Sequence, residues 1–467
     1  MSPLPPNPDH DRYQSGVRDH LLLHFGQHAR LAAGGEVLVL DGAEGIYVRD
    51  TKGRRYLDAL SCLFCAQLGY SYGAEFAEAA KAQLTTLPFN TNWNTAHPAA
   101  IELAERLADL APAGIDRVFF TSGGSESVES AWKLARQFHL ANGEPGRTKA
   151  IARRTAYHGL SLGALAFTGI PALKEPFGVP AVDVTHVPNT GRFRAPETDD
   201  AAFTRRLLAE TEAAIVAADP STVGMLIAEP VQNAGGCFTA PDGYWVGLRE
   251  LADRYGFLLV ADEVITGFGR IGEYFAVSTT GAVPDMITTA KGLTSAYAPM
   301  GAVLVSDRVA EVFFRPGQSL LHGITFAGHP LAAGIALRNL DIFERDGVLD
   351  NVRTLMPHLR DRFAELAKLP VVGDTRGDGF FYAAELVGAE GGDRLDAEQR
   401  DLLVRGFIPQ RLRDAGLIAR ADDRGEPVVQ IAPPLVCDRS ELDKIVDALG
   451  SVLTDAGERI GLAGRAA

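Results

Sequence analysis

The sequence predicts an α/β protein with a mainly parallel sheet in a large domain and a smaller α/β domain beside it. From about Gly73 onward, short apolar runs, Gly-rich turns and amphipathic helices alternate along the chain. This alternation is typical of parallel strands that are joined by helices on both faces of a sheet. The length of 467 residues is sufficient for two or three domains.

The segments before and after this alternating region predict that both chain ends contribute to the smaller domain. Near the N-terminus, residues 36–40, 45–48 and 54–57 have the pattern of short antiparallel strands, with a turn at Asp41-Gly42. We expect the N-terminal strands to pack on the C-terminal unit. The expected division is residues 1–72 and 345–467 for the small domain and residues 73–344 for the large domain.

Periodicity predicts the individual elements of both domains. In the large domain we expect strands at 117–120, 150–153, 222–228, 257–260 and 286–289, with helices at 126–138, 244–255 and 332–343. In the C-terminal unit we expect a helix at 352–366, strands at 371–373, 380–386 and 428–431, and a closing helix at 440–454.

Composition narrows the classes of function and the compartment. The net charge of −14 argues against a general nucleic-acid binder and against adsorption to anionic membranes. Four cysteines are too few for a disulfide framework, the N-terminus lacks the pattern of a signal peptide, and no apolar run reaches membrane-spanning length, so we expect a cytoplasmic protein. Because Cys62-x-x-Cys65 has no second Cys or His pair at ligand spacing, we expect two buried thiols and no metal.

A lysine and an aspartate at predicted strand ends indicate the chemistry. Lys291 opens the turn after the strand at 286–289, and Asp262 ends the preceding strand. Pyridoxal phosphate chemistry needs both groups: an amine that binds the cofactor aldehyde, and a carboxylate that keeps the pyridine nitrogen protonated. Since one crossover separates the two strand ends, both side chains can face one cofactor.

Other strand ends carry groups that suit the same cofactor. Thr121-Ser122-Gly123-Gly124-Ser125 follows one strand and opens a helix, so its N–H groups and hydroxyls can bind a phosphate. Tyr157 can stack on a flat ring, while His158 is either a packing residue or an acid or base. Glu229 follows the strand at 222–228, where an acid has a functional or a purely structural role.

Six motifs occur in the order that is known from one enzyme family. They are Phe120 to Glu126, Tyr157-His158-Gly159, Glu229-Pro230-Val231-Gln232, Leu259 to Arg270, Ala290-Lys291-Gly292 and Thr325 to Pro330. Together they resemble the class III, or omega, aminotransferases, which are fold type I pyridoxal phosphate enzymes. The likeness covers almost the whole chain. It departs from the usual family pattern at Gly123, where a serine is frequent, and at Ile271, where a threonine is frequent.

This resemblance implies a role for each matching residue. Lys291 would bind the cofactor and move the substrate proton, and Asp262 would pair with the pyridine nitrogen. Val264 and Tyr157 would cover the two ring faces, and Gln232 would reach the ring hydroxyl. Gly124 and Ser125 would bind the phosphate, with His158 and Glu229 completing the set. Thr325 would reach the phosphate of a neighbouring subunit, which implies a homodimer.

The resemblance also suggests a substrate class. Arg420 is similar to the mobile arginine of the amine and omega-amino acid:pyruvate branch, and we interpret its polar, glycine-containing segment as a flexible one. The alternative is a surface arginine that is paired with Asp422 and Asp423. Apolar residues predicted to line the substrate entrance are Leu63, Phe64, Phe89 and Trp93. We therefore expect pyruvate as acceptor, with beta-alanine, a diamine or a related terminal amine as donor.

Other functions remain open at this point. The same motifs occur in ornithine and 4-aminobutyrate transaminases that use 2-oxoglutarate, in diaminopelargonate synthase, in an aminomutase and in a decarboxylase. A non-catalytic pyridoxal sensor would need a basic DNA-binding segment, which this acidic chain lacks. A dinucleotide-dependent enzyme would need the Gly-x-Gly-x-x-Gly fingerprint, and the phosphate turn does not have it.

Overall fold

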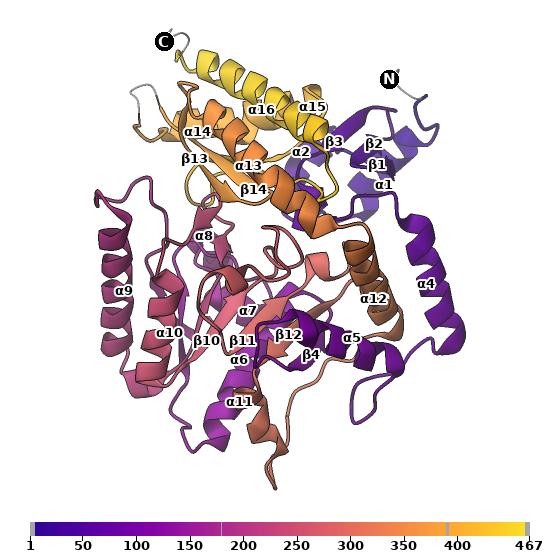
Figure 1. Ribbon diagram of the computed structural model, residues 1–467. Coiled ribbons are helices and arrows are strands. Elements are labelled where there is room, and N and C mark those ends of the chain that lie inside the picture. The colour runs from indigo at the N-terminus through magenta and orange to yellow at the C-terminus, as the bar shows by residue number, and fades with distance from the viewer. Residues whose placement is uncertain (1–4, 179, 389–391, 463–467) are drawn as a thin grey trace.

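A seven-stranded sheet lies at the centre of the computed structural model, which describes residues 5–178, 180–388 and 392–462 (Figure 1). In spatial order its strands are β4 (Arg117–Thr121), β12 (Gly301–Val305), β11 (Met286–Thr289), β10 (Leu258–Asp262), β7 (Val223–Ala228), β5 (Lys149–Arg153) and β6 (Asp183–Val187). Only β12 runs antiparallel to its two neighbours. The other six strands therefore end at the same edge of the sheet, and the predicted mainly parallel sheet is confirmed.

Both faces of this sheet are covered by helices, as the apolar runs predict. In β10, Leu258 and Val260 share one apolar cluster with α6 (Gly124–Ala141) and α7 (Leu162–Phe167). Leu259 and Ala261 belong to the opposite cluster, with α5 (Pro98–Leu110), α9 (Asp200–Ala217), α10 (Tyr244–Tyr255) and α12 (Pro330–Arg345). Successive strand residues point to opposite faces, so a fully apolar strand must be buried on both. Each buried leucine contributes roughly 1.5–3 kcal/mol.

Segments from both chain ends build two smaller sheets above the central one in Figure 1. The first contains β1 (Leu40–Glu44), β2 (Tyr47–Asp50), β3 (Arg55–Asp58) and β15 (Leu417–Ile418), and the second β13 (Val372–Asp378), β14 (Phe381–Leu386), β17 (Val428–Ile431) and β16 (Arg420–Asp422). Parallel pairing of β3 with β15 joins the N-terminal strands to the C-terminal unit. β8 (Val231–Gln232) and β9 (Phe238–Thr239) form a separate two-stranded sheet that pairs with neither of these.

The remaining helices lie around these sheets and end where the sequence supplies caps. A capping box of Asp438 and Glu441 starts α16 (Arg439–Arg459), and Gly256, at φ +74°, ends α10. The other helices are α1 (His10–His20), α2 (His28–Ala32), α3 (Ser61–Phe64), α4 (Gly73–Thr86), α8 (Pro171–Lys174), α11 (Asp307–Ala310), α13 (Val348–Leu366), α14 (Ala397–Arg400) and α15 (Ile408–Asp414). Within the described ranges, no helix has the length and apolar character needed to cross a bilayer.

The N-terminal strands differ from the prediction. Residues 36–39 are not in a strand, and the Asp41-Gly42 pair lies inside β1, next to an irregularity in its register. The chain turns instead at Gly45 and Ile46, because Glu44 pairs with Tyr47 and Gly45 adopts φ +61°. Two strands of the seven-stranded sheet, the edge strand β6 and the inner strand β12, were not predicted from the sequence.

Candidate active site

A cavity of about 450 Å³ lies at the edge of the central sheet where the parallel strands end. The loops that follow β4, β5, β7, β10 and β11 contribute to its lining. Ligands bind at this edge in parallel α/β sheets because the strand-to-helix turns gather there. Eight of the ten residues predicted to bind the cofactor line this cavity: Gly124, Ser125, Tyr157, His158, Glu229, Asp262, Val264 and Lys291.

Lys291 extends into the cavity from a strained turn after β11. Its backbone has φ +44°, a conformation that side-chain-bearing residues adopt infrequently, and Ser295 follows at φ +46°. Asn339 of α12 holds this turn, since its amide donates to the carbonyls of Gly292 (3.0 Å) and Leu293 (3.1 Å). The Lys291 amine makes no hydrogen bond or ion pair with any described residue.

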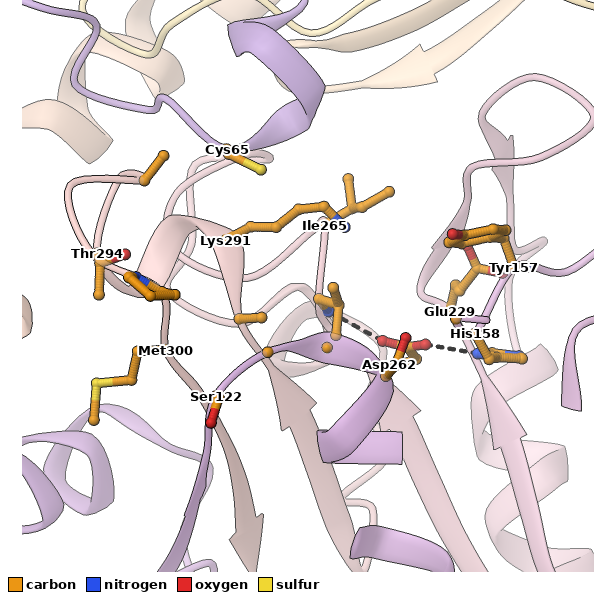
Figure 2. Close-up of a pocket in the computed structure, with 18 of the residues that line it drawn as sticks. Cys65, Ser122, Tyr157, His158, Glu229, Asp262, Ile265, Lys291, Thr294 and Met300 are labelled. Carbon is orange, nitrogen blue, oxygen red and sulfur yellow. Dashed lines mark hydrogen bonds and ion pairs between the residues drawn. The ribbon is translucent and has the colours of Figure 1, made fainter. Parts of the chain in front are cut away.

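Burial lowers the pKa of Lys291 below that of an ordinary lysine. The nearby Cys65, Asp262 and Glu229 act in the opposite direction, and the charge of Arg420 lowers the pKa further. Figure 2 shows the Lys291 side chain between Cys65 and Asp262. The lowered pKa increases the fraction of uncharged amine near neutral pH, as a proton-transferring base requires.

Asp262 is a buried carboxylate whose orientation is fixed by three hydrogen bonds. Its Oδ2 lies 2.6 Å from Nδ1 of His158 (Figure 2). Its Oδ1 accepts from the Thr288 hydroxyl and the Val264 N–H, both at 3.1 Å. Burial of a carboxylate without partners is costly, and these three donors offset that cost. A fixed anion at this position can hold a proton on a ring nitrogen that enters the cavity.

The turn from β4 into α6 forms a narrow cradle that depends on two glycines. A Cβ on Gly124 would lie 2.8 Å from Cγ1 of Val264. A Cβ on Gly159, which has φ +116°, would lie 2.3 Å from the Ser125 hydroxyl. By contrast, a Cβ on Gly123 would contact nothing within 4 Å, so the serine frequent in the family also fits there. The cradle lies at the N-terminus of α6, where the first N–H groups of a helix suit a phosphate.

Glu229 connects the loop that carries Tyr157 to the end of β7. Its Oε1 accepts from the Tyr157 N–H at 3.3 Å, and its Oε2 accepts from the Asn233 N–H at 2.9 Å. Burial raises the pKa of the Glu229 carboxyl. These bonds place the Tyr157 ring at the cavity wall, so Glu229 positions a residue of the cavity in addition to lining it.

Two predicted cofactor residues do not line the cavity of this chain. The Gln232 amide donates to the backbone carbonyls of Arg154 and Ala234, both at 3.2 Å, and its side chain is buried. Thr325 is exposed on the surface, beyond the cavity. The ring-hydroxyl role of Gln232 and the intersubunit role of Thr325 stay predictions.

The residues predicted at the substrate entrance do not line this cavity, and their entrance role stays a prediction. Phe64 is only 1% exposed and packs edge-on against Phe381, with ring centres 5.6 Å apart, whereas the neighbouring Leu63 is 54% exposed. Neither lines the cavity, and Cys65 does. The reason is a kinked backbone, with positive φ at Ser61, Cys62 and Phe64, which redirects the side chains. The expectation of two buried thiols is also wrong, because Cys62 is exposed and Cys65 is half-buried.

Phe89 and Trp93 are exposed and lie outside the cavity as well. Phe89 packs against Phe326 with ring centres 5.7 Å apart, in the segment that also carries Thr325. Trp93 contacts the same segment, because a Cβ on Gly323 would lie 2.7 Å from its indole nitrogen. These residues therefore form an exposed apolar surface.

Arg420 lies in a strand, not in the flexible segment that the sequence suggested. It begins β16 and pairs in register with Gln430 of β17. Its guanidinium forms an ion pair with Asp422 at 2.9 Å and lies 5.8 Å from the ring centre of Phe64. The side chain is 18% exposed and does not line the cavity. Any movement of Arg420 toward a substrate must therefore come from side-chain rotation, since the backbone is held by the sheet.

Sequence reasoning missed several contributors to the site. Thr288 supplies a hydroxyl to Asp262 because the two residues are register partners in adjacent strands. Gly159 belongs to the Tyr157 motif but had no predicted role, and its φ of +116° and the close approach of Ser125 show why a glycine is needed there. Met300 and Thr294 line the cavity from the segment before β12, and no motif indicated them.

Comparison with known proteins identifies the family. The aminotransferase class-III profile matches residues 31–453. A probable aminotransferase of Mycobacterium tuberculosis is 48% identical over 94% of both chains, and a putrescine–pyruvate aminotransferase of Pseudomonas aeruginosa is 36% identical over 93% of this chain and 94% of its own. A thermostable (S)-enantioselective omega-transaminase from Thermomicrobium roseum superposes with a TM-score of 0.91 at 37% identity, covering 96% and 99% of the two chains. The chain belongs to the class III aminotransferases, which have the fold type I architecture and use pyridoxal phosphate.

The cavity fits this cofactor. Lys291 supplies an unpaired amine, Asp262 a fixed anion, and the Gly124 cradle a narrow seat at a helix N-terminus. Pyridoxal phosphate supplies an electron-withdrawing ring that makes transfer of an amino group possible. With this group bound, the residues of the chain would hold the ring and exclude water from it, and the Lys291 amine would move a proton.

Proposed function

We propose that this aminotransferase moves an amino group from a terminal amine or omega-amino acid to pyruvate. The donors that we propose are beta-alanine, a diamine or a related compound. One observation carries the proposal: the described residues that line the cavity include no arginine, and Arg420 lies beyond it in an ion pair with Asp422. A donor without an α-carboxylate thus meets no unpaired arginine in the pocket.

The same arrangement accommodates a keto acid in the second half of the reaction. Burial lowers the pKa of Lys291 and raises the pKa of Tyr157, and Arg420 is near enough for its charge to act on both groups as well. Rotation of its long side chain away from Asp422 would present a two-pronged donor to the carboxylate of pyruvate. Lys291 would then move the proton at the reacting carbon, which its lowered pKa supports.

The named relatives support this choice of substrates. The Pseudomonas aeruginosa relative is named for putrescine, a diamine, and for pyruvate, and the Thermomicrobium roseum relative for omega-transamination. The alternative is a 4-aminobutyrate or ornithine transaminase that uses 2-oxoglutarate. That acceptor carries a second carboxylate and would need a second cation at the site.

We also propose that two copies of the chain assemble into the active enzyme. Phe89, Trp93 and Phe326 are 41%, 59% and 64% exposed and lie in the same region as Thr325. An apolar surface of this kind is characteristic of a protein interface. A second copy that covers it would bring Thr325 toward the other copy's cradle, as the family resemblance implies. Light scattering should give a mass of about two 49.9 kDa chains, and a fully active monomer would contradict this assembly.

The substitution Arg420→Ala tests whether Arg420 binds the keto-acid acceptor and not the amine donor. We expect the variant to keep its affinity for simple amines and to lose affinity for pyruvate by at least about tenfold, because a charged hydrogen bond contributes about 1.5–3 kcal/mol. The two half-reactions can be followed separately by absorbance of the bound cofactor. If the affinity for amine and for pyruvate fell equally, Arg420 would have a structural role and not a substrate-binding one.

A further inference from the structure

Asp422 is shared by two arginines beside the active-site cavity. Arg424 binds it with two parallel side-chain bonds, from Nε to Oδ1 and from Nη2 to Oδ2, both at 2.9 Å. The Arg424 N–H adds a third bond to Oδ1 at 3.1 Å. Arg420 contributes one ion-pair contact, from Nη2 to Oδ2 at 2.9 Å. The two arginines therefore hold the same carboxylate unequally.

The Asp422–Arg424 pair is fixed in place by close backbone packing. Gly425 follows Arg424 and approaches the large domain closely: a Cβ at this position would lie 2.5 Å from the Thr155 side chain and 2.9 Å from Cα of Gly235. Asp422 itself lies in β16, where it pairs with Val428. The close packing at Gly425 restricts movement of this backbone segment and keeps Arg424 beside Asp422.

This pair also lies next to the cavity wall. The Arg424 guanidinium is 5.9 Å from the ring centre of Tyr157, which lines the cavity. Asp422 is 7% exposed, and Arg424 and Arg420 are 23% and 18% exposed. Removal of a carboxylate from water is costly, and burial raises the pKa of Asp422 accordingly.

These contacts determine whether the charge of Asp422 stays paired when Arg420 moves away. If Arg420 left Asp422 and no other cation were present, a buried carboxylate would lose its only charged partner. With Arg424 in place, the carboxylate stays neutralised and keeps three hydrogen bonds. The neighbouring acid, Asp423, does not compete for either arginine, because it pairs with Arg405 at 2.8 Å.

We propose that Asp422 is the resting counter-ion of Arg420, and that Arg424 is a positioning residue that lets Arg420 leave Asp422 for the carboxylate of the keto-acid acceptor. The proposal rests on the carboxylate-binding role of Arg420 in the proposed function and extends it to two residues outside the cavity. Arg424 touches neither substrate nor cofactor in this arrangement. Its effect on catalysis is to weaken the hold of Asp422 on Arg420.

The test compares three variants: Arg424→Gln, Arg424→Lys and the double variant Asp422→Asn/Arg424→Gln. In Arg424→Gln, Asp422 keeps its charge and binds Arg420 more strongly, so the KM for the keto acid should rise about tenfold, or about 1.4 kcal/mol. The KM for the amine should change much less. Arg424→Lys keeps the cation and should restore most of the affinity. In the double variant the competing carboxylate is gone, and the keto-acid KM should return to within about threefold of the original value.

The control is Arg394→Gln, which breaks the exposed Arg394–Glu426 pair close to Arg424 and leaves the Arg405–Asp423 pair intact. It should leave the keto-acid KM within about twofold of the original, as expected for a surface pair. A readout without turnover is the affinity of the holoenzyme for propionate, a carboxylate that has no keto group. This affinity should fall in Arg424→Gln and recover in the double variant.

The outcomes separate this inference from the proposed function. If the unmodified enzyme uses 2-oxoglutarate and not pyruvate, the proposed acceptor is wrong, and the same variants are compared with 2-oxoglutarate. If it transfers no amino group, propionate binding still tests the inference. An unchanged keto-acid affinity in Arg424→Gln would overturn the inference. Equal losses in the single and double variants would also overturn it, because Arg424 would then bind the substrate directly or stabilise the fold.

Discussion

A methyl group added at Gly124 tests the phosphate cradle most sharply. In Gly124→Ala the new Cβ would lie 2.8 Å from Cγ1 and 3.2 Å from Cγ2 of Val264. Contacts below 3.0 Å cannot persist, so Val264 must move. Its backbone N–H is tied to Asp262 at 3.1 Å, and a β-branched side chain has few alternative rotamers. The displacement therefore reaches the residue that is expected to cover one face of the cofactor ring.

The expected size of the effect follows from overpacking. Insertion of one methyl group into a well-packed site costs about 1–3 kcal/mol. If this cost falls on cofactor binding, the affinity for pyridoxal phosphate should decrease by roughly 5-fold to 150-fold. Gly159→Ala should be more harmful, because its Cβ would lie 2.3 Å from the Ser125 hydroxyl and its φ of +116° does not suit alanine.

The assay is a titration of the cofactor-free protein with pyridoxal phosphate, followed by absorbance. Gly123→Ser is the matched control: it adds a larger side chain one residue earlier, where a Cβ meets nothing within 4 Å. Its affinity should equal that of the unmodified protein. Equal affinities for the Gly124→Ala and Gly123→Ser variants would refute the cradle as the phosphate seat.

Three further predictions concern the lysine, a buried acid and the aspartate. Lys291→Ala should still bind pyridoxal phosphate, without a covalent link, and should lose transamination; retained turnover would exclude Lys291 as the catalytic amine. Burial raises the pKa of Glu263 from 4.5 to about 7, so the folded protein favours the protonated carboxyl, and its stabilising effect is complete below pH 4.5 and disappears as the pH rises through about 7. Glu263→Gln should flatten this part of the pH dependence of the free energy of unfolding in urea titrations, and an unaltered slope would contradict the assignment. Asp262→Asn should reduce kcat by several orders of magnitude with little change in folding, because the ring nitrogen loses its counter-ion; a change of less than tenfold would argue against that pairing.

The central sheet was predictable because its strands are apolar on both faces. The runs that became β7, β10 and β11 could be located within one or two residues. The missed strands have specific causes. β6 is a partly exposed edge strand with polar residues, and β12 follows Lys291 without the helical crossover that marks a parallel strand.

The candidate site was predictable to the extent that it depends on strand ends. Asp262 and Lys291 line one cavity because β10 and β11 are adjacent and parallel. The entrance was not predictable in the same way. Because the backbone has positive φ at Cys62 and Phe64, Cys65 and not Phe64 lies at the cavity wall. No local sequence pattern signals such a kink. Arg420 looked flexible because its segment is polar, yet it forms a strand by antiparallel pairing with the apolar β17, which follows after a short loop.

Analysis of the amino acid product tests directly whether pyruvate is the amino-group acceptor. The purified protein with added pyridoxal phosphate is incubated with a panel of terminal amines and with either pyruvate or 2-oxoglutarate, and alanine and glutamate are quantified. We expect alanine from pyruvate, with beta-alanine or a diamine among the active donors. Glutamate formed from 2-oxoglutarate, with no alanine formed from pyruvate, would contradict the account and assign the enzyme to the 4-aminobutyrate or ornithine type.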